Sequence, residues 1–79
     1  MWHVKTSLGT FWILETDEKA QKYYLGCDDE TIAEYDSIDT LLDDVCNQET
    51  GYQRWDKVLR VKSPPNQIEA WDEGPPENW

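Results

Sequence analysis

The chain has 79 residues, with 17 Asp or Glu against 7 Lys or Arg, so its formal net charge at pH 7 is −10. This length allows at most one domain. A hydrophobic share of 38% and an aromatic share of 13% are too large for a typical disordered acidic tail, so we expect a folded domain. The charge argues against nucleic acid and anionic membranes as direct partners, because both would repel the chain. It fits a partner with a basic surface, or it serves only to keep the protein soluble.

The apolar stretches and the cysteines predict a cytoplasmic protein. The segment MWHVKTSLGTFWIL lacks the long apolar core of a signal peptide, and no stretch approaches the roughly 20 apolar residues of a membrane span. Cys27 and Cys46 are too few for the disulfide framework of a small secreted domain. We expect both thiols to be reduced, with a Cys27–Cys46 disulfide as the alternative.

Four strands are predicted in the first half of the chain, from runs that are rich in β-branched and aromatic residues. The segment SLG at residues 7–9 is a short turn with glycine, which is typical of a hairpin. Polar runs separate the later strands. The pattern therefore predicts an antiparallel four-stranded β-meander, with strands at residues 2–6, 10–15, 22–27 and 31–36.

One amphipathic helix is predicted after the strands. Its apolar residues recur at i, i+3, i+4, i+7 and i+8, namely at Ile38, Leu41, Leu42, Val45 and Cys46. Asp36 and Ser37 are both suitable N-caps, and Gly51 is a natural residue for the C-terminal stop. The predicted fold class is therefore α+β, with the helix packed on one face of the sheet.

The remaining chain is expected to wrap back over the domain. Residues 57–62 are compatible with a short last strand. Residues 66–71 are compatible with one helical turn, whose N-cap and core contacts would be Asn66, Ile68 and Trp71. The acidic, proline-rich residues 73–79 are expected to form a loosely held tail, which leaves a single α+β domain at residues 1–72.

The sequence contains no catalytic or metal-binding pattern. The single histidine, His3, has no nucleophile or acid at a fixed spacing. Together with Cys27 and Cys46 it lacks the paired spacing of a structural zinc site. The acidic run at residues 28–36 lacks the glycine and the terminal glutamate of a calcium loop, and no glycine-rich phosphate loop is present. We therefore predict that the protein is not an enzyme and holds neither a cofactor nor a metal.

The acidic residues of the middle third are the candidate binding site. No Lys or Arg occurs between Lys22 and Arg54. A helix places residues at i, i+3 and i+7 along one side, so a row of carboxylates is expected from Asp36, Asp39 and Asp43. Acids at the preceding turn and strand, and Asp44 beside the row, complete the candidate set of Asp28, Asp29, Glu30, Glu34, Asp36, Asp39, Asp43 and Asp44.

This row could act as a nucleic-acid mimic. Duplex DNA presents regularly spaced anions, and a row of carboxylates on a rigid element could occupy the Arg and Lys groups that bind phosphate. Binding of that kind is steered by charge and is sensitive to salt. The alternative is that the row is only the solvated face of an amphipathic helix.

The aromatic residues support a second function. We expect Trp12 and Trp55 to fill a small core, and Trp79 to be exposed. A surface formed by Trp12, Tyr24 and Trp55 would instead indicate an adaptor or regulatory module, in which the charge serves only solubility. A homodimer through a sheet face or an edge strand is a third possibility, although two chains of charge −10 repel each other.

Three segments, WHVKTSLGTFWI, LGCDDE and GYQRWD…PPNQIEAW, resemble a family of short acidic bacterial proteins that are often found on mobile elements. The resemblance covers most of the chain and implies no activity and no site residues. Small acidic proteins of such elements include anti-CRISPR and anti-restriction inhibitors, several of which are similar to nucleic-acid mimics; this is an analogy of size and charge. Taken together, the sequence predicts a monomeric, non-enzymatic inhibitor that blocks the basic surface of a nucleic-acid-binding protein or complex.

Overall fold

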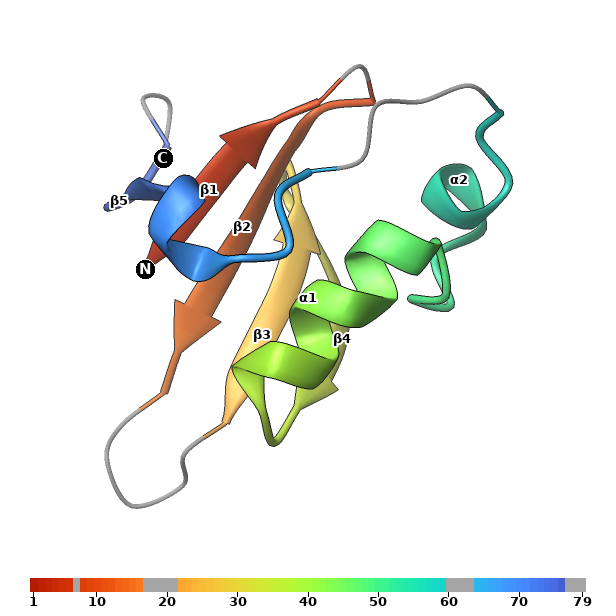
Figure 1. Cartoon of the computed structure of the whole chain (residues 1–79). Helices are drawn as coiled ribbons and strands as arrows, with labels where there is room; N and C mark the ends of the chain where they lie inside the picture. The colour runs from red at the N-terminus through yellow and green to blue at the C-terminus, as the bar shows by residue number, and fades with distance from the viewer. Residues whose placement is uncertain (7, 17–21, 60–63, 77–79) are drawn as a thin grey trace.

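The computed structural model describes residues 1–6, 8–16, 22–59 and 64–76. These residues form an α+β fold, in which one antiparallel sheet carries helix α1 on one face (Figure 1). The strand order across the sheet is β4-β3-β2-β1-β5. The strands are β1 Trp2–Lys5, β2 Thr10–Glu15, β3 Tyr23–Cys27, β4 Glu30–Tyr35 and β5 Asp72–Glu73. The helical elements are α1 Ile38–Asn47, α2 Gln53–Asp56 and the 3-10 turn η1 Ile68–Ala70.

The predicted α+β class is confirmed, but the number of strands is wrong. Strands β1 to β4 form the predicted meander, and a fifth strand, β5, adds to the free side of β1. The pairs are Trp2 with Glu73 and His3 with Asp72, and the Gly74 N–H donates to the Met1 carbonyl at 2.7 Å. A two-residue strand is too short to show an alternating pattern, so the sequence does not reveal it. The predicted start of the tail, residue 73, falls inside β5.

The core lies between the sheet and the segments that cover its α1 face. Residues that pair directly across an antiparallel ladder lie on the same face. Phe11 pairs with Cys27 and Ile13 pairs with Leu25, and all four are buried. Opposite them, α1 contributes its buried residues Leu41, Leu42 and Val45. Full burial of one such aliphatic side chain contributes about 1.5–3 kcal/mol, which makes this layer the main source of stability.

Helix α1 ends earlier than the sequence predicts. The predicted stop at Gly51 is wrong, because the helix ends at Asn47 and Gln48 adopts the left-handed conformation with φ 56°. The side-chain amide of Gln48 donates through Nε2 to the carbonyls of Trp55 at 2.7 Å and Val58 at 2.8 Å. These two bonds hold Gln48 in a conformation that glycine usually occupies. At the other end Ser37 is the N-cap, although its side chain makes no capping bond.

The chain after α1 forms a helical turn where the sequence indicated no helix. Helix α2 places Trp55 in the core, where its ring meets Phe11 edge-on at a centroid distance of 4.8 Å. The Trp55 indole N–H donates to the Val45 carbonyl at 2.9 Å. Residues 57–59 are not in a strand, so the described part of the predicted strand at 57–62 is wrong, and the rest of it lies outside the described residues.

The predicted C-terminal wrap is present in the described residues. The segment after residue 64 crosses the same face of the sheet as α1 and leads through η1 to β5 (Figure 1). The Cys46 thiol donates to the Pro64 carbonyl at 3.0 Å, and the indole N–H of buried Trp71 donates to the Pro65 carbonyl at 2.7 Å. The predicted turn at 66–71 is thus confirmed, with Gln67 rather than Asn66 as its N-cap.

Trp12 occupies the opposite face of the sheet. It pairs with Gly26, and a Cβ atom on Gly26 would lie 1.9 Å from the indole ring. The ring therefore lies directly over the Gly26 backbone, and its N–H donates to the Asp28 carbonyl at 2.8 Å. Trp12 is only 5% exposed and Trp55 is fully buried, which confirms the predicted placement of both in the interior. Trp79 lies outside the described residues.

Candidate functional site

Asp28 has a structural role in the turn between β3 and β4. It is in the left-handed region with φ 52°, and its backbone N–H donates to the Thr10 carbonyl at 2.9 Å. Its carboxylate accepts a hydrogen bond from the Thr10 N–H at 3.0 Å. The side chain and the backbone of Asp28 therefore hold the start of β2 against the end of β3, and this carboxylate is already engaged within the fold.

Asp29 and Glu30 continue the same turn and are both exposed. Burial, and then a hydrogen bond to Glu30, raise the pKa of the Tyr52 hydroxyl above its usual value. Glu30 therefore links the edge of the sheet to the residues before α2. The Asp29 side chain makes no hydrogen bond or ion pair with any residue in the described ranges.

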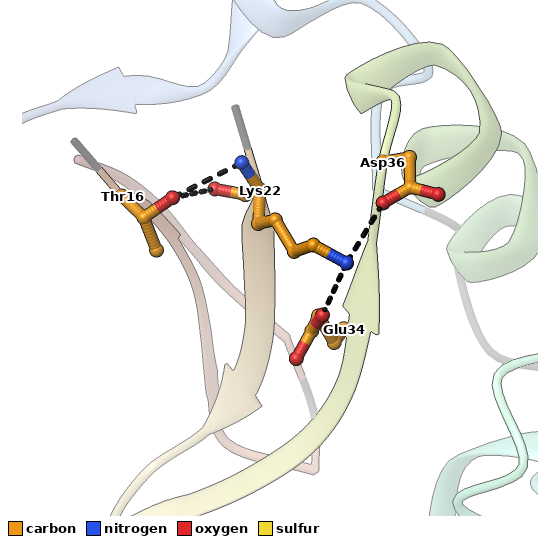
Figure 2. A network of polar contacts seen from close by, with 4 residues as sticks. All are labelled: Thr16, Lys22, Glu34 and Asp36. Carbon is orange, nitrogen blue, oxygen red and sulfur yellow. Dashed lines mark hydrogen bonds and ion pairs between the residues drawn. The ribbon is translucent and has the colours of Figure 1, made fainter. Parts of the chain in front are cut away.

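Residues 23–53 contain no Lys or Arg, and the Lys22 side chain neutralises part of their negative charge. Figure 2 shows its ammonium between two carboxylates, at 2.9 Å from Glu34 Oε1 and 3.2 Å from Asp36 Oδ1. The hydrogen bonds to Glu34 and then Asp36 raise the pKa of Lys22. The backbone of Lys22 is fixed by Thr16, whose hydroxyl donates to the Lys22 carbonyl and accepts from its N–H, both at 3.0 Å. The sequence did not reveal this contact, because β3 and β4 must pair before Lys22 and Glu34 become neighbours.

Asp44 is turned toward the sheet and bonded to Tyr35. The Tyr35 hydroxyl donates to Asp44 Oδ2 at 2.9 Å, so this pair links β4 to α1. Burial, and then this hydrogen bond to a carboxylate, raise the pKa of Tyr35 far above its usual value. A phenol that stays protonated is a permanent donor, and Asp44 is thereby assigned to the fold as well.

Asp39 and Asp43 are the two acids of α1 that remain open to solvent. Both are exposed, one helical turn apart, which places their Cβ atoms about 5–6 Å from each other. Neither side chain makes a hydrogen bond or ion pair with any residue that the structure describes. Burial, and then the charge of Asp43, raise the pKa of the Cys46 thiol, so Asp43 lies on the Cys46 flank of the helix. Because the Cys46 thiol bonds Pro64, this flank faces the C-terminal segment.

The eight candidate acids therefore do not form one continuous row. With about 100° of rotation per helical residue, Asp44 points about 100° away from Asp43 and about 140° away from Asp39. Asp36 precedes α1 and contacts Lys22, so the predicted row is reduced to Asp39 and Asp43. We call these two residues the α1 acid pair.

Asp56, which the sequence analysis did not single out, also has a structural role. Its Oδ1 accepts from the Thr50 N–H at 3.0 Å and the Thr50 hydroxyl at 2.7 Å, and its Oδ2 accepts from the Gly51 N–H at 2.7 Å. It closes the loop between α1 and α2. A carboxylate with three donors is engaged within the fold and is not a binding group.

The aromatic surface that the alternative function requires is not formed by the expected residues. Trp12 and Trp55 are buried, and Tyr24 is only partly exposed. The large hydrophobic side chains that are exposed in the described ranges are Leu14, on the face of the sheet that bears Trp12, and Leu59 after α2. The prediction that Trp12, Tyr24 and Trp55 form an exposed docking surface is therefore wrong.

The thiols and the histidine are also engaged in packing. No disulfide joins Cys27 and Cys46, so the alternative of a bridge between them is wrong. Burial, and then the charge of Asp28, raise the pKa of the Cys27 thiol to about 11, which keeps it protonated and unreactive at neutral pH. The His3 ring lies with Nδ1 2.8 Å from the Gly74 carbonyl and Nε2 3.8 Å from the Asp72 carboxylate, and so it supports β5.

The described residues show neither a metal site nor a membrane-spanning helix. Among the described residues, no cluster of three or more His, Cys, Asp or Glu side chains is arranged to hold a metal ion. No helix in the described ranges combines the length and the apolar character that crossing a membrane requires. Comparison with family models, with curated proteins and with solved structures gives no match. The resemblance to acidic proteins of mobile elements therefore depends on the three sequence segments alone.

Proposed function

We propose that this protein is a non-enzymatic inhibitor that binds the basic, nucleic-acid-binding surface of a partner protein through the α1 acid pair. The observation that carries the proposal is that Asp39 and Asp43 are exposed and have no partner among the described residues. Of the other acids between Lys22 and Arg54, five make contacts within the fold, namely Asp28, Glu30, Glu34, Asp36 and Asp44. Asp29 and Glu49 are exposed but lie outside α1. Asp39 and Asp43 are therefore the two open carboxylates that the helix holds one turn apart.

The α1 acid pair is unfavourable for the protein itself. Like charges at i and i+4 on a helix destabilise it by about 0.2–0.5 kcal/mol. Asp39 is favourable in the first turn, where the helix dipole attracts an anion, but Asp43 lies in the C-terminal half, where the dipole does not. A residue that costs stability and makes no hydrogen bond or ion pair within the described residues fits a role in binding better than a role in folding.

The geometry suits a partner that binds phosphate. Two carboxylates whose Cβ atoms lie about 5–6 Å apart on a rigid helix can each accept hydrogen bonds from a guanidinium or ammonium group. Arg and Lys groups that contact successive phosphates are spaced on a similar scale, because each DNA strand carries one charge per roughly 3.4 Å of axis. The net charge of −10 would steer such a partner toward the protein over longer distances.

The proposed setting is the cytoplasm, and the proposed active form is a monomer. Two cysteines that are not joined in a disulfide are compatible with a reducing compartment. Repulsion between two chains of charge −10 opposes self-association. An adaptor function through exposed aromatic residues has no specific observation in its favour, because Trp12 and Trp55 are buried.

The test is capture from a bacterial lysate at low salt with three immobilised proteins: wild type, Asp39→Lys/Asp43→Lys, and the control Glu15→Lys/Glu69→Lys. The control makes the same change in net charge at two exposed positions outside α1. We expect wild type and control to retain DNA- or RNA-binding proteins that salt and added duplex DNA both release, and the α1 variant to lose them. The proposal is wrong if the α1 variant captures the same proteins as wild type, or if duplex DNA releases none of them.

A further inference from the structure

The two edges of the sheet differ in what they offer to another chain. The β5 edge is two residues long, whereas the β4 edge spans six residues from Glu30 to Tyr35. Within the described ranges no strand pairs with the outer side of β4, and no hydrogen bond reaches its backbone from any element other than β3. Unpaired N–H and C=O groups along an edge are a template for an added strand.

The pairing pattern identifies which backbone groups are open. The Thr16 N–H donates to the Lys22 carbonyl, and the Asp28 N–H donates to the Thr10 carbonyl, both at 2.9 Å. In an antiparallel ladder, hydrogen-bonded and non-hydrogen-bonded pairs alternate. The even-numbered residues of β3 therefore direct their backbone N–H and C=O groups to β2, and the odd-numbered residues of β3 direct theirs to β4.

Glu34 is consequently the central open position. Tyr23 pairs with Tyr35 and Leu25 pairs with Ala33, so the residues on either side of Glu34 direct their backbone groups into the sheet. The N–H and C=O of Glu34 point outward. Ile32 has no pair in the β3–β4 ladder, because Leu25 pairs with Ala33 and the next residue, Gly26, pairs with Thr31. This bulge in β4 interrupts the straight edge on the N-terminal side of Ala33. The usable template is therefore short and runs over residues 33–36, which we call the β4 edge site.

Charge at the β4 edge site selects the occupant. Glu34 and Asp36 share one ammonium, that of Lys22, which contacts a single oxygen of each carboxylate. Asp44 flanks the same strand from the α1 side through its bond to Tyr35. Three carboxylates and one ammonium leave a net charge of −2, since −3 + 1 = −2. A second copy of this chain would bring the same negative charge to the edge and be repelled.

We propose that the β4 edge site accepts a short, extended, basic segment of a partner protein as a sixth strand of the sheet. The N–H and C=O of Glu34 bond the backbone of that segment. Its alternate Arg or Lys side chains meet the free oxygens of Glu34 and Asp36 on one face, and Asp44 lies toward the other face. The β4 edge site does not include the α1 acid pair. This inference therefore goes beyond the proposed function and is tested independently of it.

The experiment uses ¹⁵N-labelled protein and an eight-residue peptide in which arginine alternates with valine. We expect the largest chemical-shift changes at residues 33–36, and hydrogen exchange of the Glu34 amide slowed by about tenfold when the peptide is bound, because that N–H gains a partner. A peptide that alternates glutamate with valine should not bind. Shift changes confined to the α1 acid pair, or an unprotected Glu34 amide in the saturated complex, would overturn the proposal.

Two variants separate backbone pairing from charge. Glu34→Pro removes the outward N–H and leaves the β3–β4 bonds intact, since proline is tolerated at such a position of an edge strand. Glu34→Thr removes the same charge but keeps the N–H. We expect Glu34→Pro to bind the arginine peptide about tenfold more weakly than Glu34→Thr does. Equal binding by the two variants would show that the peptide is held by charge alone. The exchange measurement on wild type decides the matter if Glu34→Pro does not fold.

Discussion

The Asp43→Lys variant should be more stable than the wild-type protein. The change removes the repulsion between Asp43 and Asp39, about 0.2–0.5 kcal/mol, and introduces an attraction of similar size in the favourable order, with the acid N-terminal to the base. Position 43 precedes the last turn of α1, so the helix dipole adds little to this change. No hydrogen bond or ion pair among the described residues is lost, because the Asp43 side chain makes none. The sum is about 0.7 kcal/mol of added stability.

Asp39→Lys is the matched control for this prediction. It relieves the same repulsion and makes the same change in charge, but it places a cation in the first turn of α1, where the dipole opposes it. The expected net change is close to zero. Urea unfolding followed by tryptophan fluorescence would measure both variants, and with a slope of about 1 kcal/mol/M the midpoint of Asp43→Lys should rise by about 0.7 M. The reasoning is refuted if Asp43→Lys is no more stable than Asp39→Lys. If Asp43→Lys is more stable than wild type and also fails to capture partner proteins from the lysate, its loss of binding cannot be attributed to unfolding.

Two further predictions concern the interior. Gly26→Ala should destabilise the protein by about 3 kcal/mol, since the added Cβ would lie 1.9 Å from the Trp12 ring, and a urea midpoint near that of wild type would contradict the close contact. Raising the pH should also destabilise the fold through Cys27, whose pKa rises from 9.0 to about 11 on folding. Because the folded state favours the protonated thiol, this contribution is fully present below pH 9 and is lost as the pH rises toward 11, by about 2 kcal/mol. Unfolding free energies measured at pH 8, 9 and 10 should therefore fall more steeply for wild type than for Cys27→Ala, and parallel slopes would contradict the assignment.

Local patterns explain most of the fold that could be predicted. The apolar residues of α1 recur at helical spacing, and the first four strands are runs of β-formers between polar turns, so both were visible along the sequence. Strand β5 and the end of α1 depend on partners far away in the chain. Gln48 ends the helix because the carbonyls of Trp55 and Val58 accept hydrogen bonds from its side-chain amide. The identity of Gln48 alone does not predict these contacts.

The candidate site shows the same division between local and distant information. The sequence correctly indicated that Asp39 and Asp43 share an exposed side of α1, because this follows from helical spacing. It did not indicate that Lys22 would neutralise Glu34 and Asp36, or that Tyr35 would bind Asp44. Each of those contacts requires two elements to pack first. A run of acids in a sequence is thus a poor guide to which carboxylates remain available.

The pairing of β1 with β5 has a consequence for the order in which the protein folds. Joining Trp2 to Glu73 directly would close a loop of about 70 residues, with an entropic cost of roughly 4 kcal/mol for a flexible chain. Two pairs in a short strand cannot offset that cost alone, so β5 can add only after the meander, α1 and η1 have shortened the loop. It should therefore be the last strand to form and the first to open, and the amides of Asp72, Glu73 and Gly74 should exchange with solvent at rates faster than global unfolding allows.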